Sequence, residues 1–403
     1  MKGFFTQKST SSKTRMAGKP LSCVSCGLYK DCKNPRMRAY GNFKKEILNI
    51  GEAPGKIEDL KRKQWQGKAG KLLQKTYEKY GIDLFEDCIN INAVNCRPKE
   101  NKTPTNFQIA CCRRRVKKVI EEYQPKIIVL FGKPALFSII GDQWLKDLGS
   151  ISKWRGYTIP DRKYKAWILP VFHPSYILRN NEKEVRTVWK KEIKQISNFV
   201  GNSFHKYKKP KIHIIGDNLQ VLNQINTDIV SIDYETTSLK PHAKGHEIVC
   251  ASISPNDYEA FVFTIPKDKE KLKPFLDILK NPTIVKTAHN IKFEHTWTKT
   301  ILNIEIQGWG WDTMLASHIF DNRHGIAGLK FQTYVQLGIV DYSSEVDSYL
   351  QAKDSNSFNK TKELMKTNEG KEKLMRYCGL DTIYQYRLMK LQTDKIEYDF
   401  LPF

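Results

Sequence analysis

Residues 231–239 read Ser-Ile-Asp-Tyr-Glu-Thr-Thr-Ser-Leu and place two carboxylates, Asp233 and Glu235, two positions apart at the end of an apolar run. Residues i and i+2 of a strand point to the same face, so both carboxylates leave one face of a sheet side by side. Adjacent carboxylates repel each other unless positive charge lies between them, and hard divalent cations suit such oxygen ligands. The alternative is a strand that ends in a polar turn, so residues elsewhere in the chain must decide.

The composition is that of a globular protein with a large excess of positive charge. The chain has 403 residues, which is enough for two or three domains, and a formal net charge of +24. This charge predicts a polyanionic partner, and nucleic acid is favoured over an anionic membrane surface because no apolar stretch approaches transmembrane length. The basic N-terminus lacks the apolar segment of a signal peptide. We therefore expect a cytoplasmic protein whose nine cysteines are thiols or metal ligands rather than disulfides.

Changes in composition and periodicity divide the chain into segments. Residues 1–20 are polar and basic and predict a flexible tail. Residues 21–200 alternate strand-like and helical segments, which predicts an α/β/α domain with a parallel sheet and functional loops after the strands. Residues 201–210 have few apolar side chains and predict a linker. Residues 211–403 predict a second domain that contains both strands and helices.

The second domain begins with a different pattern of strands. Three successive strand-like runs, at 229–234, 247–254 and 258–265, predict an antiparallel meander. A helix over about 269–280 and a strand over 284–288 are predicted next, and the remainder is mostly helical. In the first domain, helices are predicted over 68–80 and about 105–123.

Four cysteines of the first domain predict one metal centre. Cys23 and Cys26 form a Cys-x-x-Cys pair, and Cys96 and Cys112 can supply two more thiolates. Four thiolates suit either zinc or an iron-sulfur cluster, and the residues alone leave both open. Three other cysteines are alternative ligands: Cys32, Cys88 and Cys111.

Several motifs in roughly residues 20–200 together resemble the family 4 uracil-DNA glycosylases. The motifs are Gly51-Glu-Ala-Pro-Gly55, Trp65-Gln-Gly-Lys-Ala-Gly70, Asn92-Ala-Val-Asn-Cys-Arg-Pro98, a cysteine sixteen positions after Cys96, and His173-Pro-Ser-Tyr-Ile-Leu-Arg179. The resemblance implies a [4Fe-4S] cluster held by Cys23, Cys26, Cys96 and Cys112. It also implies a pocket for a uracil base that is flipped out of DNA.

The resemblance also assigns roles to the polar residues of these motifs. Trp65 stands where the family has an aromatic that stacks on the base, and Asn92 pairs with the Watson-Crick edge. His173 donates to uracil O2 as negative charge develops on the leaving base. Glu52 positions the water or stabilises a positively charged sugar. The simpler interpretations are a core residue for Trp65 and a capping or turn residue for His173.

One departure from the family concerns Trp65, because phenylalanine is usual at this position. The larger ring narrows the predicted pocket. A domain that binds DNA without cleaving the glycosidic bond is therefore the alternative to a glycosylase.

Further acids downstream supply partners for the first two carboxylates. They lie in Thr287-Ala-His-Asn-Ile-Lys-Phe-Glu294 and in Tyr377-Cys-Gly-Leu-Asp381, with Asp312-Thr-Met-Leu between them. In this order and spacing, roughly residues 211–395 resemble the proofreading 3′-to-5′ exonuclease domain of family A DNA polymerases. The resemblance implies an α/β domain with an RNase H-like fold and a mixed sheet.

The mechanism expected for this domain uses two Mg²⁺ or Mn²⁺ ions about 4 Å apart. Asp233, Glu235 and Asp381 would bind them, and Tyr377 would orient the attacking water. Glu294 stands where the family usually has aspartate. Its longer side chain displaces the carboxylate by about one C–C bond, which predicts reduced rather than lost activity.

Residues beside these motifs are expected to have supporting roles. His289, Asn290 and Lys292 are predicted to hold the DNA strand or the loop. A metal pair of His289 and His295 is disfavoured against a structural role. Asp312 is predicted to be a helix N-cap rather than a ligand.

The combination of both domains resembles the N-terminal part of certain bacteriophage family A DNA polymerases. The sequence ends at Phe403, soon after the exonuclease motifs. We therefore expect either a fragment or a subunit whose polymerase is a separate chain, with DNA as the substrate of a phage replication protein. The alternatives are a non-catalytic first domain that binds DNA, and a chain that is a structural adaptor for a polymerase.

Overall fold

The computed structural model describes residues 20–180, 182–202, 204 and 207–399. They form two compact units, one of residues up to 204 together with Tyr334–Val340, and one of residues 207–333 and 341–399. The predicted tail, apart from Pro20, and part of the predicted linker lie outside the described residues. Within the described ranges, every helix is too short or too polar to cross a bilayer.

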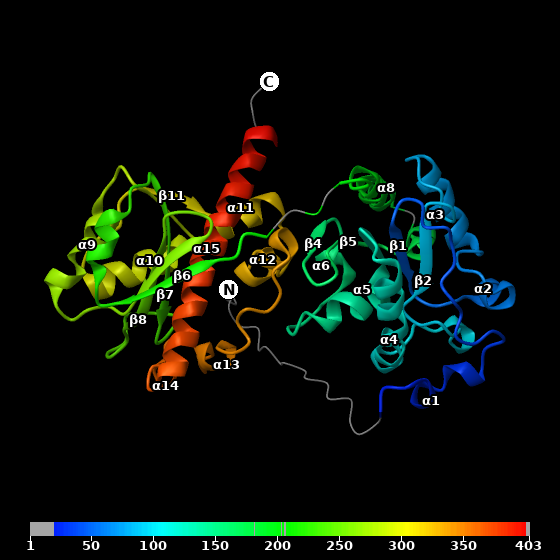
Figure 1. The fold of residues 1–403 in the computed structure, drawn as a ribbon, viewed down its shortest axis with the longest axis horizontal. Helices are drawn as coiled ribbons and strands as arrows, with labels where there is room; N and C mark the ends of the chain where they lie inside the picture. The colour runs from blue at the N-terminus through cyan, green and yellow to red at the C-terminus, as the bar shows by residue number, and fades with distance from the viewer. Residues whose placement is uncertain (1–19, 181, 203, 205–206, 400–403) are drawn as a thin grey trace. The chain divides into compact units, whose positions relative to one another are not determined.

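The first unit is built on a sheet with the strand order β2-β1-β3-β5-β4 (Figure 1). Neighbouring strands are parallel except for the pair β4 and β5. All residues of these strands are buried, as expected where helices cover both faces. This confirms the predicted parallel-sheet α/β domain. The strands are β1 (Ile47–Gly51), β2 (Cys88–Asn92), β3 (Ile127–Phe131), β4 (Ile159–Asp161) and β5 (Ala166–Val171).

The helices of the first unit follow the sequence signals at most ends. The predicted helix at 105–123 is observed with Thr105 as its N-cap, in a capping box with Gln108. The helix predicted over 68–80 ends two residues earlier, at Glu78. The helices are α1 (Cys23–Cys26), α2 (Lys56–Lys61), α3 (Lys68–Glu78), α4 (Asn106–Tyr123), α5 (Gly132–Ile139), α6 (Ile151–Trp154), α7 (Pro174–Arg179) and α8 (Lys183–Asn198).

The second unit has a mixed sheet with the order β11-β10-β7-β8-β9-β6. β7, β8 and β9 form the predicted antiparallel meander, whereas β10 and β11 continue the sheet in parallel beyond β7. β6 pairs in parallel with β9 at the other edge. The strands are β6 (Lys211–Gly216), β7 (Ile229–Thr236), β8 (Ile248–Ser254), β9 (Glu259–Phe263), β10 (Val285–Ala288) and β11 (Trp309–Asp312).

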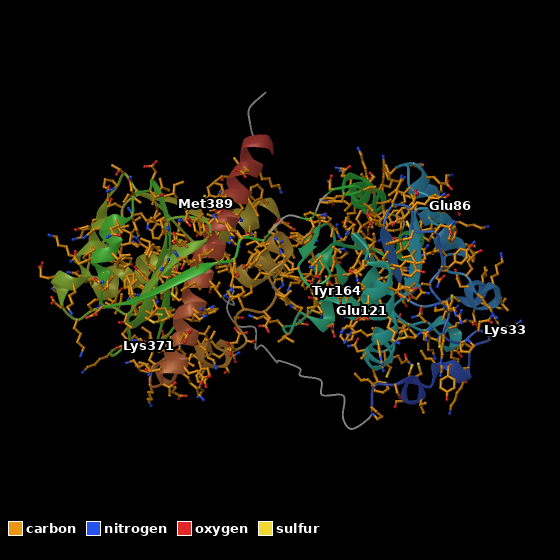
Figure 2. The ribbon with its side chains drawn as sticks, in the orientation of Figure 1. Lys33, Glu86, Glu121, Tyr164, Lys371 and Met389 are labelled. Carbon is orange, nitrogen blue, oxygen red and sulfur yellow. The ribbon has the colours of Figure 1, made fainter. Side chains whose placement is uncertain are left out.

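The long helix α15 (Asn368–Asp399) packs on the sheet of the second unit against β7 and β8. It is red in Figure 1, and Figure 2 labels Lys371 and Met389 toward its two ends. The hydroxyl of Ser252 in β8 donates to the carbonyl of Cys378 in the middle of α15. The other helices are α9 (Lys269–Lys280), α10 (Ile291–Trp297), α11 (Thr313–Phe320), α12 (Leu329–Leu337), α13 (Asp347–Leu350) and α14 (Thr361–Leu364).

Candidate functional sites

Strand β7 presents Asp233 and Glu235 on the face that α15 covers. Ile232 and Tyr234 point the opposite way into the hydrophobic core, as the period of a strand requires. Asp233 accepts a hydrogen bond from Gln385 Nε2 of α15 at 2.9 Å. Both carboxylates thus lie within a strand beneath a helix, and this strand ends one residue after Glu235, at Thr236.

The thiol of Cys378 lies beside these two carboxylates. Ligand atoms of Asp233, Glu235 and Cys378 lie within 4.8 Å of one another, the one such group of three among the described residues. The Cys378 thiol is 3.7 Å from Asp233 Oδ2. The group lacks Asp381 and Glu294, although both were predicted to converge here.

Asp381 lies on α15 and is 5% exposed. Both of its carboxylate oxygens accept from Lys330 Nζ, with 2.6 Å to Oδ2. Its Oδ1 also accepts from the Tyr342 hydroxyl at 2.5 Å. The positive charge beside Asp381 is thus the ammonium group of Lys330.

Glu294 and Tyr377 are both buried near this site. Glu294 lies on α10, is 2% exposed, and its Oε2 has no hydrogen-bond partner among the described residues. The pKa of Glu294 is raised well above its usual value, first by burial and then by the charge of Asp233. Tyr377 is 8% exposed, and its ring lies 4.1 Å from Lys330 Nζ.

Burial dominates the electrostatics of the paired carboxylates. It raises the pKa of Asp233 well above the usual value, and the charge of Asp381 adds to this effect. Burial likewise raises the pKa of Glu235, with Asp233 as the next cause. A divalent cation would displace these protons, so metal binding and deprotonation are coupled at this site.

Asp312 is the predicted N-cap and holds two helix ends together. Its Oδ1 accepts from the backbone N–H groups of Met314 and Leu315 at the start of α11. The same carboxylate accepts from the backbone N–H groups of Asn290 and Ile291 at the start of α10. This fixes the helix that carries Glu294.

The two histidines near this site have separate structural partners. His289 Nδ1 lies 2.9 Å from Thr313 Oγ1, and burial lowers the pKa of His289 to about 4. His295 Nδ1 accepts from Trp309 Nε1 at 3.3 Å. A metal pair of these histidines is not formed.

Three polar residues of the first unit lie at the carboxyl ends of three parallel strands of its sheet, β1, β2 and β5. Glu52 follows β1, Asn92 ends β2, and His173 follows β5 as the N-cap of α7. Burial raises the pKa of Glu52, and the charge of Arg179 opposes this shift. Burial lowers the pKa of His173 to about 4, and Arg179 adds to the effect. The imidazole is therefore neutral at pH 7.

Trp65 fills the space beside these residues. Its ring stacks on His173 at 5.6 Å with 28° between the planes and meets Phe131 edge-on at 5.2 Å. It also packs directly on Gly51, where an added Cβ would lie 3.1 Å from the indole and 2.4 Å from Asn92 Oδ1. Trp65 is 8% exposed and belongs to the core, which matches its simpler interpretation.

The predicted cluster ligands surround one cavity of about 310 Å³, including its opening to solvent. Backbone and side-chain N–H groups of Asn95 point at Cys112 Sγ at 3.4 and 3.6 Å. The backbone N–H of Arg36 points at Cys96 Sγ at 3.2 Å. Such N–H···S contacts stabilise thiolates that hold a metal. The cysteines that line the cavity are Cys23, Cys26, Cys96, Cys111 and Cys112.

The three alternative cysteines are in different places. Cys111 lines the same cavity, and Cys32 lies against Cys96. Cys88 is fully buried in β2, in the hydrophobic core with Tyr77, and does not line the cavity. The structure therefore removes Cys88 as a ligand, because strand pairing turns its side chain into the core.

Some residues of both sites were not predicted from the sequence. Gln385 lies four positions after Asp381, so helical periodicity alone places it on the same face. Asn95 lies within the motif that supplied Asn92. Lys330 and Tyr342 carry no signal of this kind, since their contacts with Asp381 span 51 and 39 positions.

Comparisons with known proteins define a DNA-processing protein with two α/β domains. Residues 38–195 match the uracil DNA glycosylase superfamily, and residues 217–397 match the 3′-5′ exonuclease family. Through its first unit the chain belongs to the type-4 uracil-DNA glycosylase family, and its second unit is a 3′-5′ exonuclease domain. Both resemblances inferred from the motifs are confirmed.

Individual relatives cover one or both units. The type-4 uracil-DNA glycosylase of Thermotoga maritima is 34% identical over 178 residues, which is 44% of this chain and 89% of the relative. That of Saccharolobus solfataricus is 34% identical over 43% of this chain and 80% of the relative. A DNA polymerase of Bacillus phage SP01 is 26% identical over 328 residues, 72% of this chain but 34% of the polymerase.

Among solved structures, Brucella melitensis NrnC bound to pGG is 23% identical. The similarity covers 47% of this chain and 84% of NrnC, with a TM-score of 0.36.

Proposed function

We propose that the second unit hydrolyses DNA from the 3′ end with two divalent metal ions, as part of a phage replication or proofreading protein. The observation that carries this proposal is the pair of half-buried Asp233 and buried Glu235 on the face of β7 that α15, the helix of Asp381, covers. These oxygen donors suit Mg²⁺ or Mn²⁺. Bound ions would activate the attacking water and stabilise the leaving 3′ oxygen.

The residues of this chain supply the remaining parts of the reaction. Asp233, Glu235 and Asp381 hold the ions. Tyr377 orients the water from the same helix as Asp381. Glu294 completes the acidic set from α10, where its buried carboxylate has an oxygen free of hydrogen bonds among the described residues.

Digestion of a 3′-labelled single strand in Mg²⁺ or Mn²⁺ tests this proposal. The Asp233→Ala variant should digest slower by a factor on the order of 1,000 or more, because the strand loses a metal ligand. Glu305→Ala is the matched control, since this acid pairs with Lys299 at the surface of the same unit. Undiminished digestion by Asp233→Ala would refute the metal site.

For the first unit we propose recognition of uracil in DNA. Glu52, Asn92 and His173 lie at the carboxyl ends of three strands of the sheet. A flipped base would meet an amide and a neutral imidazole there. His173 would donate to uracil O2 as charge develops, and Glu52 would position the water or stabilise the sugar cation. Release of uracil from single strands is the test, with a Glu52→Ala, His173→Ala double variant as comparison. Equal release by both proteins would exclude glycosylase activity at this site.

A second candidate function for this unit is DNA binding without base excision. The stack of Trp65 on His173 favours it, because rings 5.6 Å apart leave no room for a base between them. Binding of uracil-containing strands without release of the base would support this candidate.

We propose that the cysteine-lined cavity holds a [4Fe-4S] cluster through Cys23, Cys26, Cys96 and Cys112. The four thiols line one cavity, and N–H groups of Arg36 and Asn95 point at the sulfur atoms of Cys96 and Cys112, which supports a metal centre here. Iron and sulfide should be found in protein purified without oxygen. A colourless protein with zinc and no iron would contradict the cluster.

We also propose that the chain acts beside a DNA polymerase in the host cytoplasm. The DNA polymerase of phage SP01 is similar to both units of this chain, which supports this proposal. A polymerase reading frame that continues from or adjoins the gene is the expected finding.

A further inference from the structure

Lys330 is the most completely surrounded cation of the second unit's site. It is the second residue of α12, and its Nζ donates to both carboxylate oxygens of Asp381. Nζ also donates to the Tyr342 hydroxyl at 3.1 Å. That hydroxyl in turn donates to Asp381, so ammonium, phenol and carboxylate form a closed ring of hydrogen bonds.

Two aromatic faces complete the surroundings of this ammonium. Nζ lies 4.2 Å from the centroid of the Tyr342 ring and 4.1 Å from that of Tyr377. The two rings are stacked with centroids 6.1 Å apart. Ring faces attract cations at such distances, and the attraction grows where water is excluded. The place of Nζ is thus a cation site formed by one carboxylate and two tyrosines.

The other half of the acidic site has no such partner. Asp233 receives hydrogen bonds from the neutral groups of Gln385 and Cys378. Asp233, Glu235 and Cys378 have the spacing of metal ligands, whereas Asp381 lies outside this group in the described chain. Asp233 and Glu235 can therefore accept a cation, whereas Asp381 already has the ammonium group of Lys330 beside it.

We propose that Lys330 is the resident cation of the metal-free exonuclease site, where its ammonium takes the place of one divalent ion at Asp381. This inference rests on the proposed two-metal function. A first ion binds at Asp233 and Glu235. Asp381 becomes a metal ligand when Lys330 leaves it, which the four-carbon stem of lysine permits. Lys330 is a positioning residue that acts through Asp381.

Titration of the free full-length protein with Mn²⁺, followed by calorimetry and by the electron paramagnetic resonance of unbound Mn²⁺, tests the proposal without DNA. The Lys330→Met variant should bind an ion at Asp381 roughly tenfold more tightly or better, because a competing charge is gone. Lys330→Arg keeps the charge and should bind Mn²⁺ as weakly as the unaltered protein. Lys299→Met removes one surface lysine of the same unit and is the matched control.

Thermal melting checks that the variants fold and gives a second readout. Without metal, Lys330→Met should melt lower by about 5 °C or more, because Asp381 loses its partner. Saturating Mn²⁺ should restore its melting temperature, and Lys330→Arg should melt close to the unaltered protein. A Lys330→Met protein that melts normally but binds Mn²⁺ no more tightly than the unaltered protein overturns the inference.

The outcomes also separate this inference from the proposed function. Loss of Mn²⁺ binding in Asp233→Ala, with unchanged binding in Lys330→Met, would keep the metal site and overturn the role of Lys330. Absence of Mn²⁺ binding in the unaltered protein would overturn both.

Discussion

The base site proposed for the first unit and the metal site proposed for the second each contain a side chain of the protein that packs on the site's own residues. Trp65 fills the first with a rigid indole, packed between Gly51, Phe131 and His173. Lys330 fills the second with an ammonium on a flexible stem. Lys330 lies where we propose a metal ion, and Trp65 lies beside the residues that we propose hold the base.

The difference lies in what must move to admit a ligand. Trp65 has a positive φ of 60°, and an added Cβ at Gly70 would lie 1.9 Å from its carbonyl oxygen, so its backbone is tightly enclosed. Removing its ring from the core exposes a large apolar surface. Lys330 would leave Asp381 by a change of side-chain rotamer in our proposal, with an entering cation in place of its charge. We therefore expect the site of the second unit to open more readily than that of the first.

The largest expected effect is the loss of digestion in Asp233→Asn. Its rate should fall on the order of 1,000-fold, because an amide is a poor ligand for Mg²⁺. Uracil binding by the first unit should be unchanged. A parallel loss in both assays would show that the two sites are not independent.

The same variant has a consequence for stability. Burial raises the pKa of Asp233, so the unfolded chain releases this proton at lower pH than the folded chain does. Stability of the metal-free protein therefore falls as pH rises from about 4 through the raised folded pKa. Asp233→Asn removes this loss and should melt higher than the unaltered protein at pH 7 in chelator. A lower melting temperature would contradict the burial argument.

The next largest effect is expected from Trp65→Phe. The smaller ring leaves room beside His173, so release of uracil should rise about tenfold or appear where it was absent. Tyr80→Phe is a suitable control, because this aromatic also packs against the core of the first unit. Unchanged release, with intact binding of DNA, would favour the binding module over the glycosylase.

A smaller effect is expected from the half-buried His173 of the first unit. The pKa of His173 is about 4 when folded and about 6.5 when unfolded, so the unfolded chain gains a proton first as pH falls. Stability is therefore lost between about pH 6.5 and 4, and no such loss exists above pH 6.5. His173→Asn should lessen this loss by on the order of 1 kcal/mol. Chemical unfolding of both proteins at pH 7 and 5 measures the difference.

The smallest effect is expected from Glu294→Asp. The shorter carboxylate restores the usual residue of the exonuclease family and should change the rate of digestion by about threefold. A thousandfold loss would show that the length of Glu294 is required by the site.

The sequence predicted those features that depend on local periodicity. Asp233 and Glu235 share a face because a strand repeats every two residues, and Asp312 caps a helix because it precedes one. Cys88 was kept as an alternative ligand because proximity in sequence does not reveal which way a strand side chain points. Short-range geometry thus predicted the positions of Asp233, Glu235 and Asp312 but not the direction of the Cys88 side chain.

The remaining features depend on contacts between distant segments. Lys330 is one of 67 lysines and arginines, and its helix gives no sign that it reaches Asp381. The stack of Trp65 on His173 joins two loops that are 108 positions apart, so only the folded chain reveals that the site is filled. The contact of Lys330 with Asp381 was thus beyond sequence patterns, whereas Trp65 was predicted to narrow the pocket and only its stack on His173 needed the folded chain.

The most direct test of the account is a crystal structure of the second unit's site after soaking the full chain in Mn²⁺, with anomalous scattering to locate the ions. We predict Mn²⁺ between Asp233, Glu235 and Asp381, with Lys330 moved away from Asp381. Lys330 still bound to Asp381, with no Mn²⁺ at the three carboxylates, would contradict it.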